Sequence, residues 1–155
     1  MKKILVTGCA GFIGSHLTEY LLLQKNNVIG IDNLSNGKLK NLESFQHQKN
    51  FNFINCDINN DKINYILDEV DVVYHLAALA DIVPSIQNPS DYFQSNVNGT
   101  FNLIKNCKNK NKKIKKFIYA ASSSCYGIPK IYPTPESSPI DPQYPYALTK
   151  RLAQP

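Results

Sequence analysis

A glycine-rich turn near the start of the chain restricts its fold more than any other segment. The turn reads TGCAGFIG and lies between an apolar run at residues 3–7 and a largely apolar segment at residues 12–24 with helical spacing. Its three glycines follow one another at intervals of three residues: Gly8, Gly11 and Gly14. A strand, a tight turn and a helix in this order are typical of a parallel α/β sheet whose first helix begins beside a phosphate group.

Apolar runs and helical segments alternate along the rest of the chain. Further strands are predicted at residues 28–31, 51–54, 70–76 and 117–121. Further helices are predicted at residues 61–67 with Asp61 as an acidic cap, from Ser90 as a cap to about residue 109, and from near Pro145. Residues 127–145 carry six prolines and are expected to form a long loop. The alternation predicts a doubly wound parallel sheet with helices on both faces, right-handed crossovers and strand order 3-2-1-4-5.

Length and composition fit one globular domain. The chain has 155 residues, of which 43% are hydrophobic and 19% charged, as in ordinary globular proteins. No apolar run approaches the ~20 residues of a membrane span, and the four cysteines have neither disulfide-framework nor zinc-ligand spacing. We therefore expect a cytoplasmic protein with reduced thiols, no metal and no membrane contact, in which His75 is a core residue. The net charge of +5 comes largely from residues 105–116, which is more typical of a solvated helix end than of a nucleic-acid-binding surface.

The glycine turn and one acidic residue together predict a dinucleotide site. Gly8 permits the tight turn, Gly11 lets the backbone approach a pyrophosphate, and Gly14 lets the helix pack closely on the strand. Asp32 ends the second predicted strand, 18 residues after Gly14 (32 − 14), where a carboxylate accepts hydrogen bonds from both hydroxyls of an adenosine ribose. Because a carboxylate repels a 2′-phosphate, the expected cofactor is NAD rather than NADP. The alternative for Asp32 is a helix cap or a turn residue.

A second group of polar residues lies toward the end of the chain. Tyr146 and Lys150 are four residues apart at the start of the last predicted helix, so their side chains share one face. A neighbouring ammonium and the helix N-terminus both favour a phenolate, which can act as a general base. The alternative is an ordinary exposed helix pair. The serines at residues 122–124 follow the fifth predicted strand, where open α/β sheets bind ligands, although such serines also stabilise turns.

Taken together, the motifs carry a family resemblance. The segments TGCAGFIG, IDNLSNG, CDI, YHLAA, NVNGT, AASSSCYG and YPYALTK follow in this order along the whole chain. The chain thereby resembles the extended short-chain dehydrogenase/reductase family, and is most similar to its UDP-glucose and UDP-N-acetylglucosamine 4-epimerase branch. The resemblance implies a Rossmann-like α/β fold, a bound NAD and a UDP-sugar substrate. It also implies a homodimer built by the long helix after Ser90 and the helix that carries Tyr146.

The resemblance further assigns roles to single residues. Contacts with the cofactor pyrophosphate are implied for Gly8, Gly11, Phe12, Ile13 and Gly14. Contacts with the adenosine ribose are implied for Asp32 and Asn33, and contacts with the adenine for Asp57 and Ile58. Contacts with the rest of the cofactor are implied for Leu76, Ala77, Ala78, Asn96 and Lys150. Catalytic roles are implied for Ser122, Tyr146 and Lys150, and substrate contacts for Ser85, Ser123 and Ser124. The implied reaction is epimerisation at C4 of the sugar through a transient 4-keto intermediate, with Tyr146 as the base for the 4-hydroxyl proton.

Several other readings stay open at the level of sequence. The 4,6-dehydratases of the family carry Asp-Glu directly after their catalytic Thr, whereas this chain carries Ser123 and Ser124, which disfavours dehydration. A nucleotide-sugar decarboxylase or reductase would keep the same cofactor residues, and a non-catalytic fragment would bind NAD without turnover. Chains of the family are much longer, so we expect residues 1–155 to form the N-terminal, NAD(P)-binding part of a Rossmann domain, with the substrate domain outside this chain.

Overall fold

A parallel five-stranded sheet forms the centre of the computed structural model, which describes residues 1–110 and 114–154. The strands are β1 (Lys3–Thr7), β2 (Asn27–Asp32), β3 (Phe51–Asn55), β4 (Val72–His75) and β5 (Lys116–Tyr119). Their order is β3-β2-β1-β4-β5, which confirms the predicted doubly wound topology. The direction of winding reverses between β1 and β4, and in such sheets a ligand crevice lies at the carboxyl ends of these two strands.

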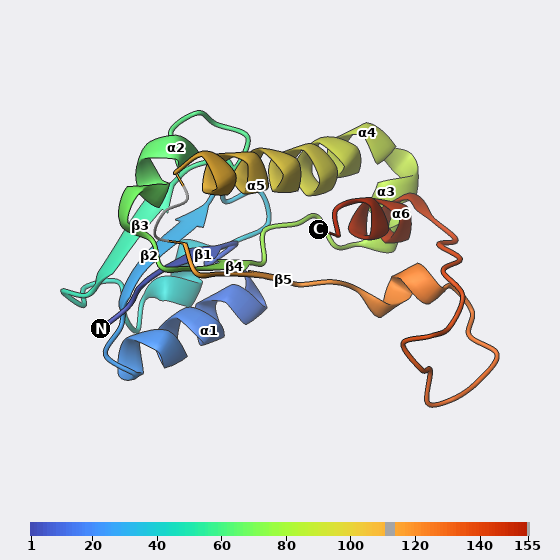
Figure 1. Cartoon of the computed structure of the whole chain (residues 1–155), viewed down its shortest axis with the longest axis horizontal. Coiled ribbons are helices and arrows are strands. Elements are labelled where there is room, and N and C mark those ends of the chain that lie inside the picture. The colour runs from blue at the N-terminus through green and yellow to red at the C-terminus, as the bar shows by residue number, and fades with distance from the viewer. Residues whose placement is uncertain (111–113, 155) are drawn as a thin grey trace.

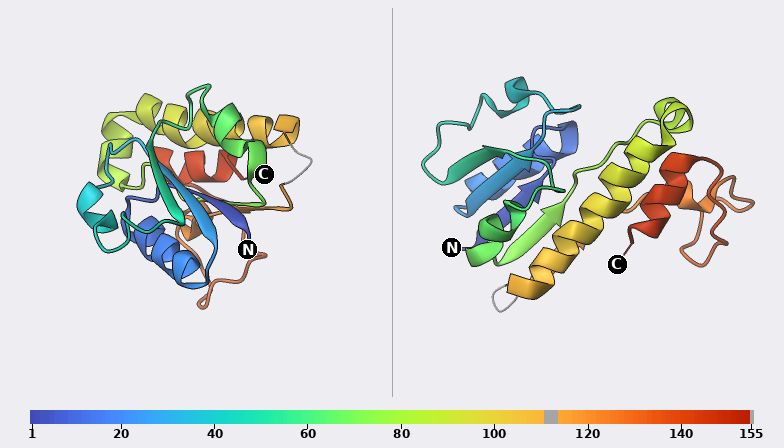
Figure 2. Two further views of the ribbon diagram at one scale, coloured as in Figure 1. Left: turned by 90° about the vertical axis from the view of Figure 1, so that its left-hand side faces the viewer. Right: turned by 90° about the horizontal axis from the view of Figure 1, so that it is seen from above.

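Helices cover both faces of the sheet and divide the core into two parts. In Figures 1 and 2, α1 (Phe12–Leu23) lies on one face, while α2 (Ile63–Ile66) and α5 (Gly99–Lys110) lie on the other. Side chains alternate between the faces along a strand. Ile4 and Val6 therefore pack in the cluster that contains Leu21 of α1, whereas Leu5 packs in the cluster that contains Leu103 of α5.

The long helical segment contains a widened turn. It begins with α4 (Pro89–Tyr92), continues as a π-helical stretch at Phe93–Asn98 and ends with α5. Asn88 is its N-cap residue and Pro89 occupies the first turn, so the prediction of Ser90 as the cap is wrong. Proline is favoured in the first turn because a backbone N–H at that position would have no intrahelical acceptor, so proline loses no hydrogen bond there. The π-helical stretch was not predicted, and turns of this kind often occur at functional sites.

A second pair of helices lies beyond the carboxyl ends of the strands. In Figures 1 and 2, α3 (Ile82–Gln87) and α6 (Pro145–Leu152) lie side by side there. The start of α6 at Pro145 agrees with the prediction, whereas α3 was not predicted. A short 3₁₀ turn at Ser123–Tyr126 follows β5, and residues 127–144 form the long loop expected from their prolines (Figure 1).

The remaining short helices differ from the sequence prediction in their ends. Lys62, and not Asp61, is the N-cap residue of α2, and a 3₁₀ turn at Leu67–Glu69 follows it. Another 3₁₀ turn, Leu39–Leu42, was not predicted. The four cysteines are free and buried. Across residues 1–110 and 114–154, no helix is both long and apolar enough to cross a bilayer, and no cluster of His, Cys, Asp and Glu could hold a metal ion.

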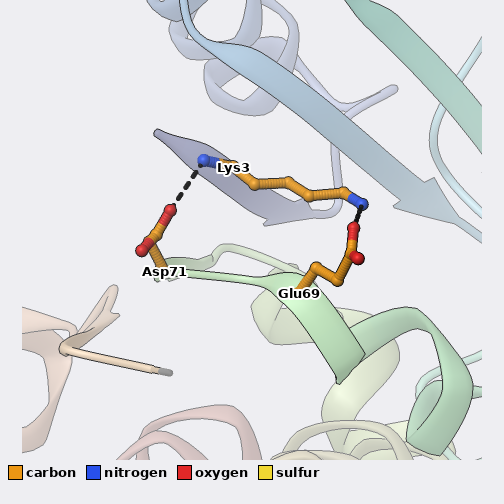
Figure 3. A network of polar contacts seen from close by, with 3 residues as sticks. All are labelled: Lys3, Glu69 and Asp71. Atoms are coloured by element: carbon orange, nitrogen blue, oxygen red, sulfur yellow. Dashed lines mark hydrogen bonds and ion pairs between the residues drawn. The ribbon is translucent and has the colours of Figure 1, made fainter. Parts of the chain in front are cut away.

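A polar cluster joins the amino ends of β1, β4 and β5. The Lys3 backbone N–H donates to Asp71 Oδ2 at 3.0 Å, and Lys3 Nζ forms an ion pair with Glu69 at 2.7 Å (Figure 3). Lys115 Nζ lies 3.4 Å from Asp71 Oδ1, and the Lys115 backbone N–H donates to the Asp71 carbonyl at 2.8 Å. The Lys3 N–H, followed by Lys115, lowers the pKa of Asp71. This cluster aligns the strands at the end of the sheet opposite the crevice.

Candidate active site

The glycine turn brings three backbones together at the start of α1. Gly8 has a φ of +70°, and a Cβ on it would lie 2.8 Å from the backbone N of Ala77. A Cβ on Gly14 would lie 2.0 Å from the Gly8 carbonyl oxygen, so these two glycines are required for packing. A Cβ on Gly11 would meet the Gly8 carbonyl oxygen at 3.3 Å. The fold itself therefore demands less of Gly11, and a glycine at this position lets a ligand approach the backbone closely.

The N-terminus of α1 opens beside this turn. Gly11 is the N-cap residue and has no side chain that could accept from the N–H groups of the first turn. The side chains of Phe12 and Ile13 are 78% and 66% exposed. Free N–H groups together with the positive end of a helix dipole form the kind of site that binds phosphate.

A cavity of about 220 Å³ lies between this turn and the carboxyl ends of the neighbouring strands. Predicted cofactor residues supply most of its lining, namely Gly8, Gly11, Phe12, Asp32, Asn33, Asp57, Ile58, Leu76, Ala77 and Ala78. Other lining residues were not predicted, namely Ile31, Ser35, Asn36, Gly37, Cys56 and Ser95. The signal for residues 35–37 was the turn-rich segment after Asp32. Four predicted cofactor residues are not part of the cavity lining: Ile13, Gly14, Asn96 and Lys150.

Asp32 is held rigidly at the rim of the cavity. Its Oδ2 accepts from the Ala10 backbone N–H at 2.9 Å, and its Oδ1 accepts from the Leu34 backbone N–H at 2.8 Å. A Cβ on Gly37 would lie 2.7 Å from Asp32 Oδ1, so a glycine is needed to pass this close. Each carboxylate oxygen keeps a further lone pair. The carboxylate can therefore accept two more hydrogen bonds in one fixed orientation, which fits the paired hydroxyls of a ribose.

A second carboxylate, that of Asp57, also lines the cavity. Asn33 Nδ2 donates to Asp57 Oδ2 at 2.7 Å, and the Asn59 backbone N–H donates to Asp57 Oδ1 at 2.8 Å. Burial by itself raises the pKa of Asp57, but these hydrogen bonds lower it overall. Asp57 thus stays ionised and ties the segments after β2 and β3 together around the cavity.

Beyond the cavity, the structure brings together the predicted catalytic hydroxyls. Tyr146 OH donates to Ser122 Oγ at 3.4 Å, although 24 residues separate them in the chain. Ser122 Oγ and Ser124 Oγ lie 2.7 Å apart, and the Ser124 backbone N–H donates to Ser122 Oγ at 3.2 Å. Ser123 is exposed on the same 3₁₀ turn. The hydroxyl oxygens of Tyr146, Ser122 and Ser124 therefore form a continuous polar edge where β5 ends.

Lys150 lies one turn after Tyr146 on α6, with 5% of its surface exposed. Burial lowers the pKa of Lys150 to about 8. Its Nζ lies 4.3 Å from the centre of the Tyr119 ring, and Tyr119 OH donates to the Lys150 carbonyl at 3.2 Å. Burial, followed by the neighbouring Tyr146, raises the pKa of Tyr119. Tyr119 was not among the predicted site residues, because in sequence it is one more aromatic residue of a strand.

Ser85 supports the start of α6. Its side chain is fully buried, its Oγ accepts from the Tyr146 backbone N–H at 3.1 Å, and it donates to the Ile82 carbonyl at 2.6 Å. The hydroxyl thus holds the first turn of α6, whose N–H groups otherwise lack partners. The predicted contact of Ser85 with a substrate stays a prediction.

Asn96 joins three segments from within the π-helical stretch. Its Oδ1 accepts from the Leu79 backbone N–H at 2.8 Å, and its Nδ2 donates to the Leu79 carbonyl at 2.9 Å and to Thr149 Oγ1 at 3.1 Å. Asn96 is 1% exposed. The segment after β4 is thereby fixed to α6 through this amide, and the predicted contact of Asn96 with the cofactor stays a prediction.

His75 connects the end of β4 to the glycine turn and to α5. Thr7 Oγ1 accepts from the backbone N–H groups of Leu76 and Ala77, so it donates to His75 Nδ1 at 2.6 Å. This pattern assigns the ring proton to Nε2, which donates to Thr100 Oγ1 at 2.8 Å. Burial, followed by the charge of Lys150, lowers the pKa of His75 to about 3. His75 is therefore a neutral buried residue, as expected.

The chain is similar in sequence and in architecture to known nucleotide-sugar enzymes. The family model for GDP-mannose 4,6-dehydratase matches residues 5–154. UDP-glucose 4-epimerase of Mycolicibacterium smegmatis is 37% identical over 151 residues, which cover 96% of this chain and 48% of that protein. UDP-glucuronic acid decarboxylase 1 of Xenopus tropicalis is 34% identical over 158 residues, which cover 99% of this chain and 36% of that protein.

A solved structure extends the likeness to three dimensions. UDP-glucuronic acid 4-epimerase from Bacillus cereus, in complex with UDP-glucuronic acid and NAD, superposes with a TM-score of 0.90 at 37% identity. The match covers 97% of this chain and 49% of that one. The chain thus spans about half or less of the length of the proteins that it matches.

Proposed function

The chain belongs to the GDP-mannose 4,6-dehydratase family of extended short-chain dehydrogenases/reductases, and from that premise we propose that it is the cofactor-binding half of a nucleotide-sugar 4-epimerase. The observation that carries this proposal is the contact of Tyr146 OH with Ser122 Oγ at the carboxyl ends of the strands, with Lys150 one turn after Tyr146 on α6. A base, a hydrogen-bonding hydroxyl and a cation at one place suit the removal of a proton from a sugar hydroxyl.

NAD fits the cavity beside the glycine turn. The open position at Gly11, the first turn of α1 and the two remaining acceptor sites of Asp32 suit a pyrophosphate and an adenosine ribose. Residues of the cavity lining would hold the cofactor, together with Ile13, Gly14, Asn96 and Lys150. When bound, NAD supplies the hydride acceptor at the sugar carbon. The similar Bacillus cereus enzyme was crystallised with NAD, which supports this choice of cofactor.

Each polar residue of the site has one task in the proposed reaction. Tyr146 takes the proton of the sugar 4-hydroxyl and later returns it. Its phenol oxygen lies against Ser122 Oγ, so both residues can contact the same sugar hydroxyl. Ser122 orients the same hydroxyl, and Ser124 extends the polar edge along the sugar. The Lys150 ammonium stabilises the phenolate form of Tyr146. Water is excluded from Lys150 by its burial, which strengthens this electrostatic effect.

The two residues after Ser122 favour epimerisation over dehydration. Ser123 and Ser124 are hydroxyl residues, and neither can act as the carboxylic acid that loss of a 6-hydroxyl requires. Decarboxylation is the second candidate, since a UDP-glucuronic acid decarboxylase is among the relatives. It would use the same proton acceptor and the same cofactor residues, and would differ in that the sugar loses its carboxyl group as carbon dioxide.

Cofactor and product measurements test the proposal. We expect calorimetric titration to show binding of NAD in preference to NADP, and Asp32→Ala to reduce that preference. Incubation with NAD and UDP-glucose, UDP-N-acetylglucosamine or UDP-glucuronic acid should give the C4 epimer by NMR, and Tyr146→Phe should give none. Release of carbon dioxide from UDP-glucuronic acid would identify a decarboxylase instead. Binding of NAD by the full-length protein without turnover of any of the three sugars would contradict the epimerase.

A further inference from the structure

Lys150 is a buried cation without a carboxylate partner. Within residues 1–110 and 114–154, no carboxylate forms an ion pair with its ammonium group, and 5% of the residue is exposed. An unpaired buried charge is costly and is normally compensated by an opposite charge. His75 and Tyr119 lie near this ammonium, and both side chains are neutral.

Tyr119 contacts both the side-chain ammonium and the backbone carbonyl of Lys150. Its ring face lies 4.3 Å from Lys150 Nζ, within the range of a cation–π interaction. Its hydroxyl donates to the Lys150 carbonyl at 3.2 Å, in the last turn of α6, where carbonyl groups lack helical partners. One side chain from β5 therefore restrains both the ammonium and the backbone of the same lysine.

An aromatic face has a consequence that a carboxylate would not have. A carboxylate would neutralise the ammonium and occupy its N–H donors, and the phenol of Tyr146 would lose the field that favours its ionised form. The ring quadrupole attracts the cation but leaves its net charge and its donors free. Resting on the proposed function, we propose that Tyr119 is a positioning residue for the reaction, which holds the Lys150 ammonium beside Tyr146 without neutralising it.

The sheet provides a matched control for this role. Phe117 lies two residues before Tyr119 on β5, so both side chains point to the same face. Both rings pack against His75, with centroid distances of 5.9 Å for Phe117 and 5.7 Å for Tyr119. Only the ring of Tyr119, of these two, also lies against Lys150. A substitution of Phe117 thus reproduces the loss of an aromatic ring against His75 and leaves the cation–π contact in place.

The test follows the Lys150 ammonium directly by NMR of the protein with isotope-labelled lysine, and Lys150→Met assigns its signal. We expect Tyr119→Leu to lower the midpoint of the Lys150 titration by about half a pH unit, since the ring no longer stabilises the charged form. Tyr119→Phe and Phe117→Leu should leave this midpoint near the wild-type value. A trifluorophenylalanine at position 119 keeps the shape of the ring but removes its negative face, so it should lower the midpoint of the Lys150 titration as Tyr119→Leu does. This variant provides the test if Tyr119→Leu does not fold.

Turnover gives the second readout. We expect kcat to fall about tenfold in Tyr119→Leu and in the fluorinated variant, with KM for the nucleotide sugar within about twofold and with recovery in Tyr119→Phe. An unchanged Lys150 titration in the fluorinated variant would overturn the role of Tyr119, as would an equal shift in Phe117→Leu. In either case, turnover by the wild type would still uphold the proposed function. The reverse result, the expected titration shifts without turnover by the wild type, would uphold the position of Tyr119 and remove the proposed reaction.

Discussion

At the scale of the residue, the glycines of the first turn differ in what they do. A Cβ on Gly14 would meet the Gly8 carbonyl oxygen at 2.0 Å, whereas a Cβ on Gly11 would meet the same oxygen at 3.3 Å. We predict that Gly14→Ala lowers the free energy of unfolding by about 3 kcal/mol or more, because backbone must move. Gly11→Ala should cost less than about 1 kcal/mol, yet weaken NAD binding at least about tenfold.

Thermal unfolding with and without NAD measures both effects. Wild-type protein and Gly11→Ala should unfold at nearly the same temperature without ligand, and at one NAD concentration the wild type should be stabilised more than Gly11→Ala. Equal binding of NAD by the wild type and Gly11→Ala would show that the pyrophosphate does not approach this turn.

His75 should make stability depend on pH below neutrality. An unfolded histidine takes up a proton below about pH 6.5, whereas the folded His75 has a pKa lowered to about 3. The unfolded state therefore binds more protons between these values, so the contribution of His75 is complete above about pH 6.5 and is lost as the pH falls toward 3. Relative to His75→Gln, the free energy of unfolding of the wild type should fall by about 1.4 kcal/mol for each pH unit as the pH is lowered from 6 to 4.

Chemical denaturation at a series of pH values checks this dependence. His16→Gln is the matched control, because His16 is exposed and its Nδ1–H donates to the Phe12 carbonyl of the same helix. Parallel pH profiles for wild type and His75→Gln would mean that the buried ring does not carry the linkage.

At the scale of the element, Asn96 joins the π-helical stretch to α6. Asn96→Ala removes three side-chain hydrogen bonds and leaves the N–H and C=O groups of Leu79 without these partners. We predict a loss of about 2–4 kcal/mol in the free energy of unfolding, and faster hydrogen exchange of the α6 amides. Asn98→Ala is the control, since Asn98 is exposed and bonds to the Gln94 side chain, and it should change stability by less than about 0.5 kcal/mol.

Exchange rates decide which element depends on Asn96. Faster exchange confined to α6 and the segment after β4 would agree with the contacts in the structure. A uniform change across the sheet would mean that Asn96 stabilises the whole core and does not specifically anchor α6.

The elements that sequence predicts well are those with their cause in local pattern. Strands buried on both faces must be apolar, so the runs at β1 and β2 were evident, and the glycine turn determined which strand precedes α1. Asp32 could be placed at a strand end for the same reason. The ten predicted cofactor residues that line the cavity all lie in such turns and strand ends.

The features that sequence missed depend on distant partners. Ser85 meets the Tyr146 backbone across 61 residues, and α3, which carries it, is short and contains Pro84. Tyr119 reaches Lys150 across 31 residues. Neither spacing nor propensity reports such contacts. The cap of the long helix was missed for a different reason. Pro89 in the first turn is a local signal for Asn88 as the cap, but Ser90 was predicted instead.

At the scale of the whole molecule, apolar side chains remain exposed on α5 and α6. Phe101 of α5 is 67% exposed, and Leu148 and Leu152 of α6 are 46% and 53% exposed. Exposed apolar groups on neighbouring elements are typical of contact surfaces. We propose that these two helices build a homodimer, and predict that Phe101→Ser shifts the protein toward monomers in analytical ultracentrifugation.

Tyr65→Ser is the matched control for this prediction. Tyr65 is 74% exposed but lies on α2, near the amino ends of the strands (Figure 1). It should leave the sedimentation coefficient unchanged. A wild-type protein that sediments as a monomer at all concentrations would contradict a dimer formed by this chain, as would equal effects of the two substitutions.

The polar cluster of Lys3, Glu69 and Asp71, drawn in Figure 3, joins the amino ends of the strands, whereas the cavity lies at their carboxyl ends, so the cluster forms the opposite pole of the molecule. Its exposed ion pair contributes less than about 1 kcal/mol and weakens in salt, so this pole tolerates alteration. Met1, 88% exposed, lies at the same end. A fluorophore or a solid support attached through Met1 would therefore leave the crevice facing the solution, which makes this pole the natural handle for an immobilised dinucleotide sensor.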